Sequence, residues 1–331
     1  MREDAGQGRV LRMGEQVMST KRDVILDIEK GVWRGVDNNP AAIEKAGKKH
    51  GFVTVEPKID GCRAIVGEHG IVSRSGRAFP ALTGLDDKIV NHLNHHVIQA
   101  GIVLDSEMYL TGMTFEESCG RLQSKEPLSA SEYANLRFAV FDATHVDVLL
   151  RKRKSHMDNA ERRALAGTAL GAATGPLFLI NNRTATCLEE VEHIYQQYRS
   201  MGFEGAMVKD PSLPYRNGKV SGCWKMKPSI AVEGRVVGFV MGKTGANVGK
   251  VVGYKVDLED GTGIVSATGL TRDRIALLTA EAELLGGADH PDMPDLGRVV
   301  EVTAMERSAH TLRHPKFSRF RDILPYKGDK V

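Results

Sequence analysis

The sequence predicts an α+β domain followed by a small all-β domain, and two observations carry this prediction. Between Lys58 and Pro228, short apolar strand patterns alternate with longer helical patterns, which fits a mixed α+β nucleotide-binding domain. After Pro228, glycine-punctuated strand patterns surround one helical stretch, which is typical of a small Greek-key barrel of the OB type. We therefore expect an N-terminal extension over residues 1–35, an α+β domain over residues 36–229 and a barrel domain over residues 230–331.

The first segments of the chain are expected to differ in their degree of order. Residues 1–35 are polar and weakly patterned, with one short helix expected through residues 24–26, so this extension is a candidate for flexibility. Asn39 and Pro40 then predict the start of a helix, because proline suits the first helical turn. The β-branched, apolar residues 52–55 predict the strand that follows this helix.

The remaining elements follow from the spacing of apolar residues. Three further helices of the α+β domain are expected, at residues 85–100, 155–169 and 188–201. Strands of the barrel domain are expected at residues 232–240, 249–258, 263–267, 297–305 and 317–323. One helix is expected at residues 272–285, before the last two of these strands.

The composition bounds the class of protein. At 331 residues the chain is long enough for two domains with sizeable cores. The formal net charge of +3 is only a weak argument for nucleic acid from the field of the whole molecule. The 4 scattered cysteines form no C-x-x-C pair, which argues against a zinc site or a disulfide framework and favours a reducing cytosol. No apolar run approaches the ~18 residues of a membrane span, so we expect a soluble, cytoplasmic protein without a membrane partner.

The segment from Glu56 to Arg63, with the sequence EPKIDGCR, carries the strongest chemical signal. Lys58 stands close to Asp60 and a glycine at the end of a predicted strand, which is a setting for a nucleophilic lysine. Such an attack needs a neutral amine, whereas an ordinary lysine has a pKa of about 10.4, so burial, cations or a metal must favour deprotonation. Asp-Gly is also a frequent hairpin turn, so the segment alone leaves a surface turn as an alternative.

Four further segments place acids, an aromatic ring or lysines at the ends of strand patterns. They are residues 104–107 (LDSE), 138–142 (FAVFD), 204–209 (EGAMVK) and 224–227 (WKMK). Alternation along the last segment would put Lys225 and Lys227 on one strand face, where two ammonium groups repel each other unless a phosphate lies between them. Taken singly, these segments also fit exposed strand ends, a core aromatic or a solvent-facing edge strand.

In their order and spacing, these segments and Ser73-Arg74-Ser75-Gly76 resemble the motifs of the covalent nucleotidyltransferases. Within that superfamily the chain resembles the ATP-dependent DNA ligases, above all the short ligases of podovirus-type bacteriophages. The resemblance runs from about Pro40 to Arg321 and extends to residues 209–222, 242–251 and 312–317. It implies a nucleotidyltransferase (ATP-grasp-like adenylation) domain followed by an OB-fold domain.

The same resemblance implies an enzyme of DNA replication, repair or recombination that uses ATP and Mg²⁺ or Mn²⁺. Its implied partner is nicked double-stranded DNA, its expected state is a monomer, and its expected location is the host-cell cytoplasm if the chain comes from a phage. Lys58 is implied to attack the α-phosphate of ATP, hold AMP and pass it to the 5′-phosphate of a nick. The 3′-hydroxyl then displaces AMP and seals the nick.

The resemblance also implies roles for individual residues. Asp60 is the second implied catalytic residue, either organising the metal or acting as general base for the 3′-hydroxyl. The implied metal ligands are Glu107 and Glu204, since hard oxygen ligands suit Mg²⁺. The implied nucleotide-binding residues are Glu56 and Phe141 at the adenine, Arg63 and Glu107 at the ribose, Arg74, Lys219, Lys225 and Lys227 at phosphate, and Ile59 beside the nucleophile.

Two alternatives remain open from the sequence. An RNA ligase or an mRNA capping guanylyltransferase shares the lysine motif, although residues 209–227 and the barrel after them resemble DNA ligases instead. A non-catalytic nucleic-acid-binding protein with the same fold is the other alternative. Loss of Lys58 or Glu204 would indicate that class, and both residues are present.

Overall fold

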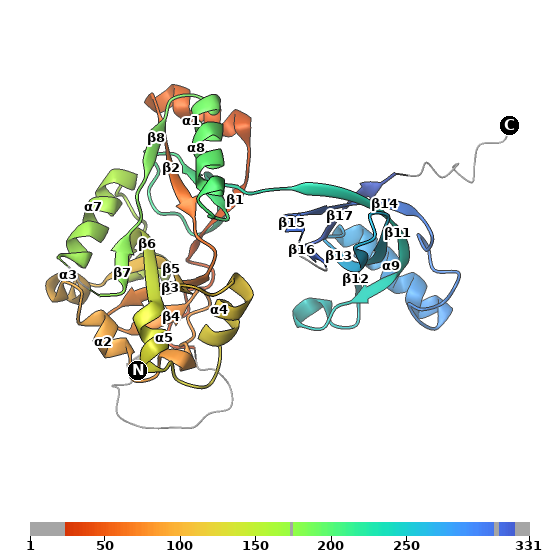
Figure 1. Cartoon of the computed structure of the whole chain (residues 1–331), viewed down its shortest axis with the longest axis horizontal. Helices are drawn as coiled ribbons and strands as arrows, with labels where there is room; N and C mark the ends of the chain where they lie inside the picture. Colours follow the sequence, from red (N-terminus) through yellow and green to blue (C-terminus); the bar gives the residue numbers. More distant parts are fainter. Residues whose placement is uncertain (1–23, 173–174, 308–310, 322–331) are drawn as a thin grey trace, which may run out of the picture. The chain divides into compact units, whose positions relative to one another are not determined.

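The computed structural model describes residues 24–172, 175–307 and 311–321, and the chain divides into two compact units, Met1–Met226 and Lys227–Val331 (Figure 1). In the described residues, the first unit contains two five-stranded sheets with helices packed on them, and the second contains a closed barrel. The mixed α/β architecture predicted from the sequence is confirmed.

One sheet of the first unit has the strand order β1-β10-β9-β2-β8, in which only the β1–β10 pairing is parallel. Its strands are β1 (Trp33–Asp37), β2 (Val53–Lys58), β8 (Arg183–Ala185), β9 (Gly205–Lys209) and β10 (Gly218–Met226). Helices α1 (Pro40–His50) and α8 (Leu188–Ser200) lie side by side on this sheet and share an apolar core with it (Figure 1). As predicted, α1 begins at Pro40, where the Asn39 side chain accepts a hydrogen bond from the backbone N–H of Ala42.

The second sheet has the order β4-β3-β5-β6-β7. Its strands are β3 (Cys62–Gly67), β4 (Gly70–Ser73), β5 (Ile102–Leu110), β6 (Leu136–His145) and β7 (Leu177–Leu179). The helices connected to it are α2 (Asp86–Val90), α3 (His95–Gln99), α4 (Phe115–Leu122), α5 (Ala130–Asn135), α6 (Val146–Leu149) and α7 (Asn159–Leu170), with a 3₁₀ turn at Pro80–Leu82. The largest apolar core of this unit lies between this sheet and its helices.

The single helix expected at residues 85–100 is wrong, because the segment forms the two short helices α2 and α3. The Asn94 side chain accepts a hydrogen bond from the backbone N–H of His96 and so caps the start of α3. Asparagine favours such a cap over a helix interior because its side chain competes with the backbone for hydrogen bonds.

Residues 24–35 belong to the first unit rather than to an extension. Ile28 and Val32 are fully buried, and Trp33 lies in β1 and packs in the same apolar cluster. No helix forms at residues 24–26, where the backbone N–H of Ile25 instead donates to Gly76. These few apolar residues show no regular spacing, so their burial depends on partners far along the chain. Residues 1–23, the rest of the expected extension, lie outside the described residues.

The second unit is built on a closed barrel of order β11-β12-β13-β17-β14. Its strands are β11 (Ile230–Met241), β12 (Val251–Leu258), β13 (Gly263–Thr268), β14 (Val299–Ala304) and β17 (Lys316–Phe320), with a small hairpin of β15 (Glu306–Arg307) and β16 (Leu312–Arg313). Helix α9 (Arg272–Leu285) packs through Leu278 and Ala282 on the barrel core, and a 3₁₀ turn spans Gly245–Asn247. Across the described ranges of both units, no helix is long and apolar enough to cross a membrane.

Candidate active site

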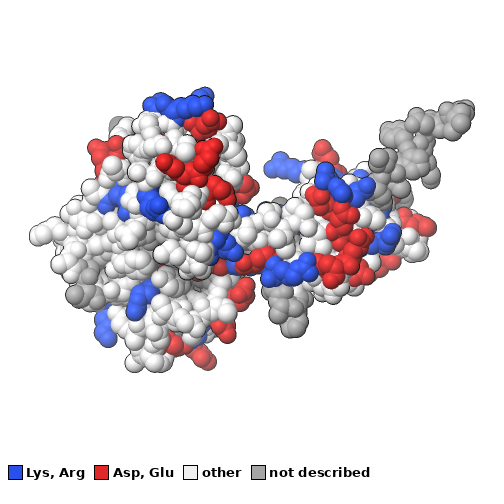
Figure 2. Space-filling view, turned by 45° about the horizontal axis from the view of Figure 1, so that its top comes forward, with Lys and Arg blue, Asp and Glu red and all other residues white. Residues whose placement is uncertain are grey.

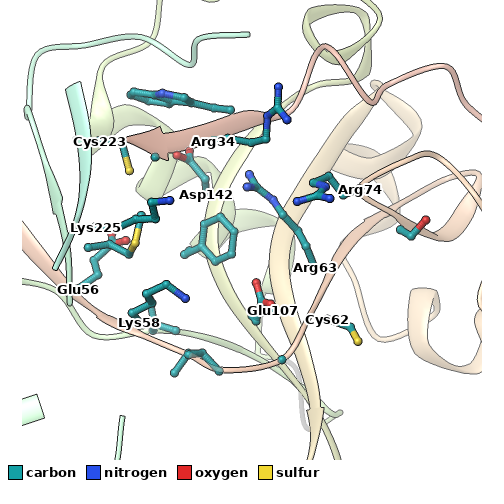
Figure 3. A pocket seen from close by; sticks show the side chains of 18 of the residues that line it. Arg34, Glu56, Lys58, Cys62, Arg63, Arg74, Glu107, Asp142, Cys223 and Lys225 are labelled. Carbon is teal, nitrogen blue, oxygen red and sulfur yellow. The ribbon is translucent and has the colours of Figure 1, made fainter. Parts of the chain in front are cut away.

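A cavity of about 800 Å³ lies in the first unit, and both of its sheets contribute to the walls. Figure 3 shows Lys58 and Lys225 on one side of this cavity and Arg63 and Arg74 on the other, with Glu107 between them. The predicted site residues that line it are Glu56, Lys58, Ile59, Arg63, Arg74, Glu107, Phe141, Lys219 and Lys225. The structure therefore brings together residues that the sequence separates by as many as 169 positions, from Glu56 to Lys225.

Lys58 is the last residue of β2, and its side chain forms an ion pair with Glu204. The position of Glu204 follows from strand pairing, because its backbone N–H donates to the Lys58 carbonyl at 3.1 Å and β9 begins at the next residue. The Glu204 side chain is only 8% exposed, so this pair lies largely out of water. The end of β2 and the residue before β9 thus place the Lys58 amine and the Glu204 carboxylate next to each other.

Glu56, two residues earlier on β2, is buried and faces two cations. Its carboxylate lies 2.7 Å from the Lys209 ammonium and 3.1 Å from the Arg163 guanidinium. Burial alone would lower the pKa of Lys209, but the carboxylates of Glu56 and Asp142 outweigh burial and raise it. Arg163 comes from α7 and was not predicted as a site residue.

Asp142 and Arg162 form a second buried ion pair behind this wall. The Arg162 Nε lies 2.6 Å from Asp142 Oδ1, and the Arg162 side chain is fully buried. Its Nη1 donates to the carbonyls of Met157 and Leu213 at 3.0 and 2.8 Å, so the charge is hydrogen-bonded on several sides. Burial would raise the pKa of Asp142, but Arg162 and Lys209 hold it below its ordinary value. The guanidinium therefore stays charged and fixed.

Arg63 is held by a chain of hydrogen bonds that crosses the two sheets. Its Nε donates to Asp105 at 2.7 Å, the Tyr215 hydroxyl donates to the same carboxylate at 2.6 Å, and the Trp33 N–H donates to that hydroxyl at 3.1 Å. The Arg63 guanidinium also lies 5.1 Å from the centre of the Phe141 ring, a cation–π contact. Burial would lower the pKa of Arg63, but Asp105 outweighs it and raises the pKa. Asp105 and Tyr215 were not predicted as site residues.

Glu107 lies opposite Arg63 in the β3–β5 pairing and is half-buried. Burial raises the pKa of its carboxyl group to about 8, although the nearby Lys58 and Arg63 favour the charged form. Burial thus favours the protonated form in the free protein, whereas a bound cation would favour the carboxylate.

Two cysteines lie at the same cavity. The sulfurs of Cys62 on β3 and Cys119 on α4 are 2.7 Å apart, and Gln123 Nε2 donates to Cys62 at 3.8 Å. The contact with Cys119 lowers the pKa of Cys62 against the effect of burial, whereas the contact with Cys62 and burial raise the pKa of Cys119. Cys62 lies within the EPKIDGCR segment of the sequence, whereas Cys119 lies in none of the predicted site segments.

Arg34 on β1 is another lining residue that sequence reasoning missed (Figure 3). Its Nε is buried and has no hydrogen-bond partner among the residues that the structure describes. Arg34 was not considered because residues 1–35 were expected to form an extension. It lies on β1, and only α1 separates this strand from β2, which ends at Lys58.

The other predicted residues lie elsewhere. Asp60 and Glu204 are not among the residues that line the cavity in the described part of the chain, although Glu204 reaches Lys58 directly. β10 ends at Met226, so Lys227 lies beyond the strand and begins the second unit. The shared strand face that alternation predicts for Lys225 and Lys227 is therefore wrong.

Comparison with known proteins identifies the family. The DNA ligase of Escherichia phage T7 is 28% identical over 93% of this chain and 100% of its own length. The DNA ligase of Enterobacteria phage T3 is 26% identical over 88% of this chain and 95% of its own length. A solved structure of the ATP-dependent DNA ligase from bacteriophage T7 in complex with ATP has a TM-score of 0.54 and 25% identity, covering 89% of this chain and 100% of that one.

These likenesses confirm the resemblance to phage ligases that the sequence motifs indicate. Residues 37–227 match the ATP dependent DNA ligase domain, which is more than half of the chain. The chain therefore belongs to the family of ATP-dependent DNA ligases.

Proposed function

We propose that this ligase joins the 3′-hydroxyl and 5′-phosphate ends of nicked duplex DNA through a covalent AMP intermediate on Lys58. The observation that carries this proposal is the position of Lys58, at a strand end in a cavity that also contains Arg63, Arg74 and Lys225. A nucleophilic amine among fixed cations suits the displacement of a phosphate group, because such reactions depend mainly on positioning and charge neutralisation.

In the first step, the Lys58 Nζ attacks the α-phosphate of ATP, a P–N bond forms and the bond to pyrophosphate breaks. The ion pair with Glu204 holds Lys58 at the cavity before the nucleotide arrives. The amine must lose a proton before it attacks, and Glu204 is the carboxylate in contact with it. Lys225 and Lys219 line the same cavity and are proposed to bind the α-phosphate.

The adenosine is proposed to bind beside Phe141 and Glu56. Phe141 offers an aromatic ring for stacking, while the cations of Arg63 and Lys209 lie 5.1 and 5.5 Å from its centre. The Glu56 carboxylate has two cationic partners, yet a carboxylate has about four acceptor sites and can still accept a hydrogen bond from the adenine amine. The proposed ribose contacts are Glu107 and Arg63, which are paired on neighbouring strands.

A divalent metal ion fits the carboxylates that the site provides. The described residues contain no group of three or more histidine, cysteine or acidic side chains arranged to hold a metal. Mg²⁺ typically keeps several waters and binds one or two carboxylates together with substrate phosphates, so Glu204 and Glu107 suffice as proposed ligands for Mg²⁺ or Mn²⁺. When bound, such an ion would neutralise charge on the phosphates.

In the later steps, AMP passes from Lys58 to the 5′-phosphate of the nick, and the 3′-hydroxyl then attacks that phosphate and releases AMP. Arg74 is proposed to contact the nick phosphate, and Asp60 to organise the metal or to accept the proton of the 3′-hydroxyl. Residues 36–229 are proposed as the adenylation domain and residues 230–331 as an OB-fold domain that contacts DNA. Lys227 is proposed to bind phosphate.

The protein is proposed to act on DNA as a monomer and to bind it through local groups. Figure 2 shows acidic and basic side chains interspersed on the visible face of both units, in keeping with the net charge of +3. A surface with interspersed charges attracts DNA only weakly over long distances. Individual cations at the site, such as Arg74, are therefore proposed to bind the phosphates.

The test is to incubate the purified chain with Mg²⁺ and α-labelled ATP or GTP, and then to follow label that survives denaturation. Label from ATP alone, and joining of a nicked DNA duplex without joining of nicked RNA, are the expected results. Label from GTP would favour a capping-type enzyme, and joining restricted to RNA would favour an RNA ligase. Absence of label from both nucleotides would contradict the covalent mechanism.

A further inference from the structure

Cys62 and Cys119 form a thiol pair that the ligation chemistry does not use. Cys62 opens β3, and Cys119 lies on α4, 57 residues further along the chain. Both residues line the cavity that contains Lys58. The pair therefore lies where small solutes that enter the nucleotide cavity can reach it.

The two backbones that carry these thiols are firmly placed. The Ser118 hydroxyl accepts a hydrogen bond from the Leu110 N–H at 2.9 Å, which fixes α4 against β5. On the other side, a Cβ atom added to Gly61 would lie 2.5 Å from the Met108 carbonyl oxygen, so the chain just before Cys62 packs tightly on the same strand. Both cysteines are thus positioned relative to β5.

The distance between the sulfurs is short. They lie 2.7 Å apart, whereas a disulfide bond is about 2.05 Å long, so a movement of about 0.7 Å brings them to bonding distance. Cys187 is exposed and Cys223 is buried, and neither has a thiol neighbour of this kind among the described residues. Cys62 and Cys119 are therefore the pair that can be oxidised within one chain.

We propose that Cys62 and Cys119 form a dithiol modification site that hydrogen peroxide converts to a disulfide, and that this bond slows adenylylation of Lys58. One thiolate attacks a peroxide oxygen, the O–O bond breaks, and a sulfenic acid forms. The second sulfur then displaces the sulfenic oxygen, so that two thiols and one peroxide yield one disulfide and two waters. A dithiol reductant reverses the bond by thiol–disulfide exchange.

The effect on the reaction rests on the proposed role of Lys58, whereas the oxidation itself does not. Only three residues separate Lys58 from Cys62, so a bond between Cys62 and α4 restrains the segment that positions the nucleophile. Misplacement of a reacting group by about 1 Å can lower a rate by roughly 100-fold. A shift smaller than this is expected here, so we expect adenylylation to slow by about tenfold or more.

The test uses the full chain with Cys187→Ser, which removes the exposed thiol that would otherwise link two molecules. Treatment with one equivalent of hydrogen peroxide, followed by peptide mapping without reductant, should yield a cross-linked peptide that contains Cys62 and Cys119. Cys223 serves as the internal reference, because burial raises its pKa to about 11 and should keep it reduced. Adenylylation is measured before oxidation, after it, and after addition of dithiothreitol.

Matched variants make the result specific. In this background, Cys62→Ser and Cys119→Ser should both lack the cross-linked peptide. The Cys62→Ser variant should keep its own reduced-state rate of adenylylation after peroxide, while the parent slows and recovers with dithiothreitol. Cys62 is half-buried rather than buried, so its replacement by serine tests the proposal even if the Cys119 variant folds poorly.

Each other outcome overturns part of the proposal. A map without the cross-link, under conditions that oxidise Cys187 in the unmodified chain, overturns the dithiol site. A cross-link that leaves the rate unchanged overturns its effect on adenylylation. A chain that shows no adenylylation even when reduced contradicts the proposed function, and the peptide map still accepts or rejects the dithiol site.

Discussion

The charged residues at the nucleotide cavity fall into two sets, named here the completed wall and the open wall, which differ in where their counter-charges come from. In the completed wall, Glu56 and Asp142 are buried and each pairs with cations of the protein, namely Lys209, Arg162 and Arg163. In the open wall, the side chains of Arg74 and Lys219 have no ion-pair or hydrogen-bond partner among the described residues, and the buried Arg34 Nε has none either. The charges of the completed wall are balanced within the protein. The open wall has cations whose counter-charges must come from outside, as expected where phosphates bind.

Lys58 is the proposed nucleophile, and its loss should have the largest effect of all. The Lys58→Ala variant is expected to lose self-adenylylation by roughly 10³-fold or more, because no other group can form the covalent link to AMP. The variant should still fold, since the change removes one amine and no core volume, although loss of the partner of Glu204 should lower its unfolding temperature. The measurement is retention of label from α-labelled ATP after denaturation, with Lys58→Arg as the charge-preserving control. Label retained in either variant would place the nucleophile elsewhere.

The completed wall should respond to mutation mainly through stability. Arg162→Met leaves the buried Asp142 carboxylate without its closest partner and should lower the free energy of unfolding by about 3–5 kcal/mol. Urea unfolding followed by circular dichroism measures this loss. The double variant Arg162→Met/Asp142→Leu removes both charges and should recover part of it. Equal losses in the single and double variants would show that the pair contributes packing rather than charge balance.

The open wall should respond mainly through activity. Arg34→Ala is expected to change the free energy of unfolding by less than about 0.5 kcal/mol, because no protein partner of its Nε is lost. Adenylylation should fall by about 10- to 100-fold, the value of one charge-assisted hydrogen bond to phosphate. Arg34→Lys is the matched control and should retain part of the rate. A large loss of stability with normal adenylylation would move Arg34 to the completed wall.

This contrast also explains which parts of the site the sequence predicts. Lys58 and Glu56 were predicted because they lie at or near the end of a strand, and Glu107 because it follows a short apolar run, although β5 continues to Leu110. The partners that balance the charges of the completed wall carry no such local signal, since Arg163 lies 107 residues from Glu56 in the sequence. The contact between Arg163 and Glu56 depends on how α7 packs against the sheets, and this packing cannot be predicted from a short segment of the sequence.

The same limit applies to the fold. The strands β2, β12 and β13 and the helices α1 and α9 were predicted, because alternation, helical spacing and capping residues are local properties. The burial of Ile28 and Val32 was not, because these residues pack on segments such as residues 65–72 and 148–149 that follow much later. The extension over residues 1–35 was expected because these residues are polar and weakly patterned, and Arg34 was for that reason not considered as a site residue.

The smallest expected effect concerns Glu107, whose carboxyl is near Lys58 and Arg63 and has a pKa raised to about 8 by burial. Because the folded state holds this proton more tightly than the unfolded state, the contribution to stability is full below about pH 4.5. It is lost as the pH rises toward 8 and is constant above that value. After allowance for solvent screening, the total is about 2 kcal/mol.

Glu107→Gln removes this titration, so the difference in unfolding free energy between parent and variant should grow in favour of the variant from pH 5 to pH 8. Urea unfolding at several pH values measures it, and Glu44→Gln on the exposed face of α1 is the control, with no such trend expected. A difference that stays constant with pH would mean that Glu107 is already ionised in the free protein. The cations Lys58 and Arg63 would then balance the Glu107 carboxylate within the protein, and Glu107 would belong to the completed wall.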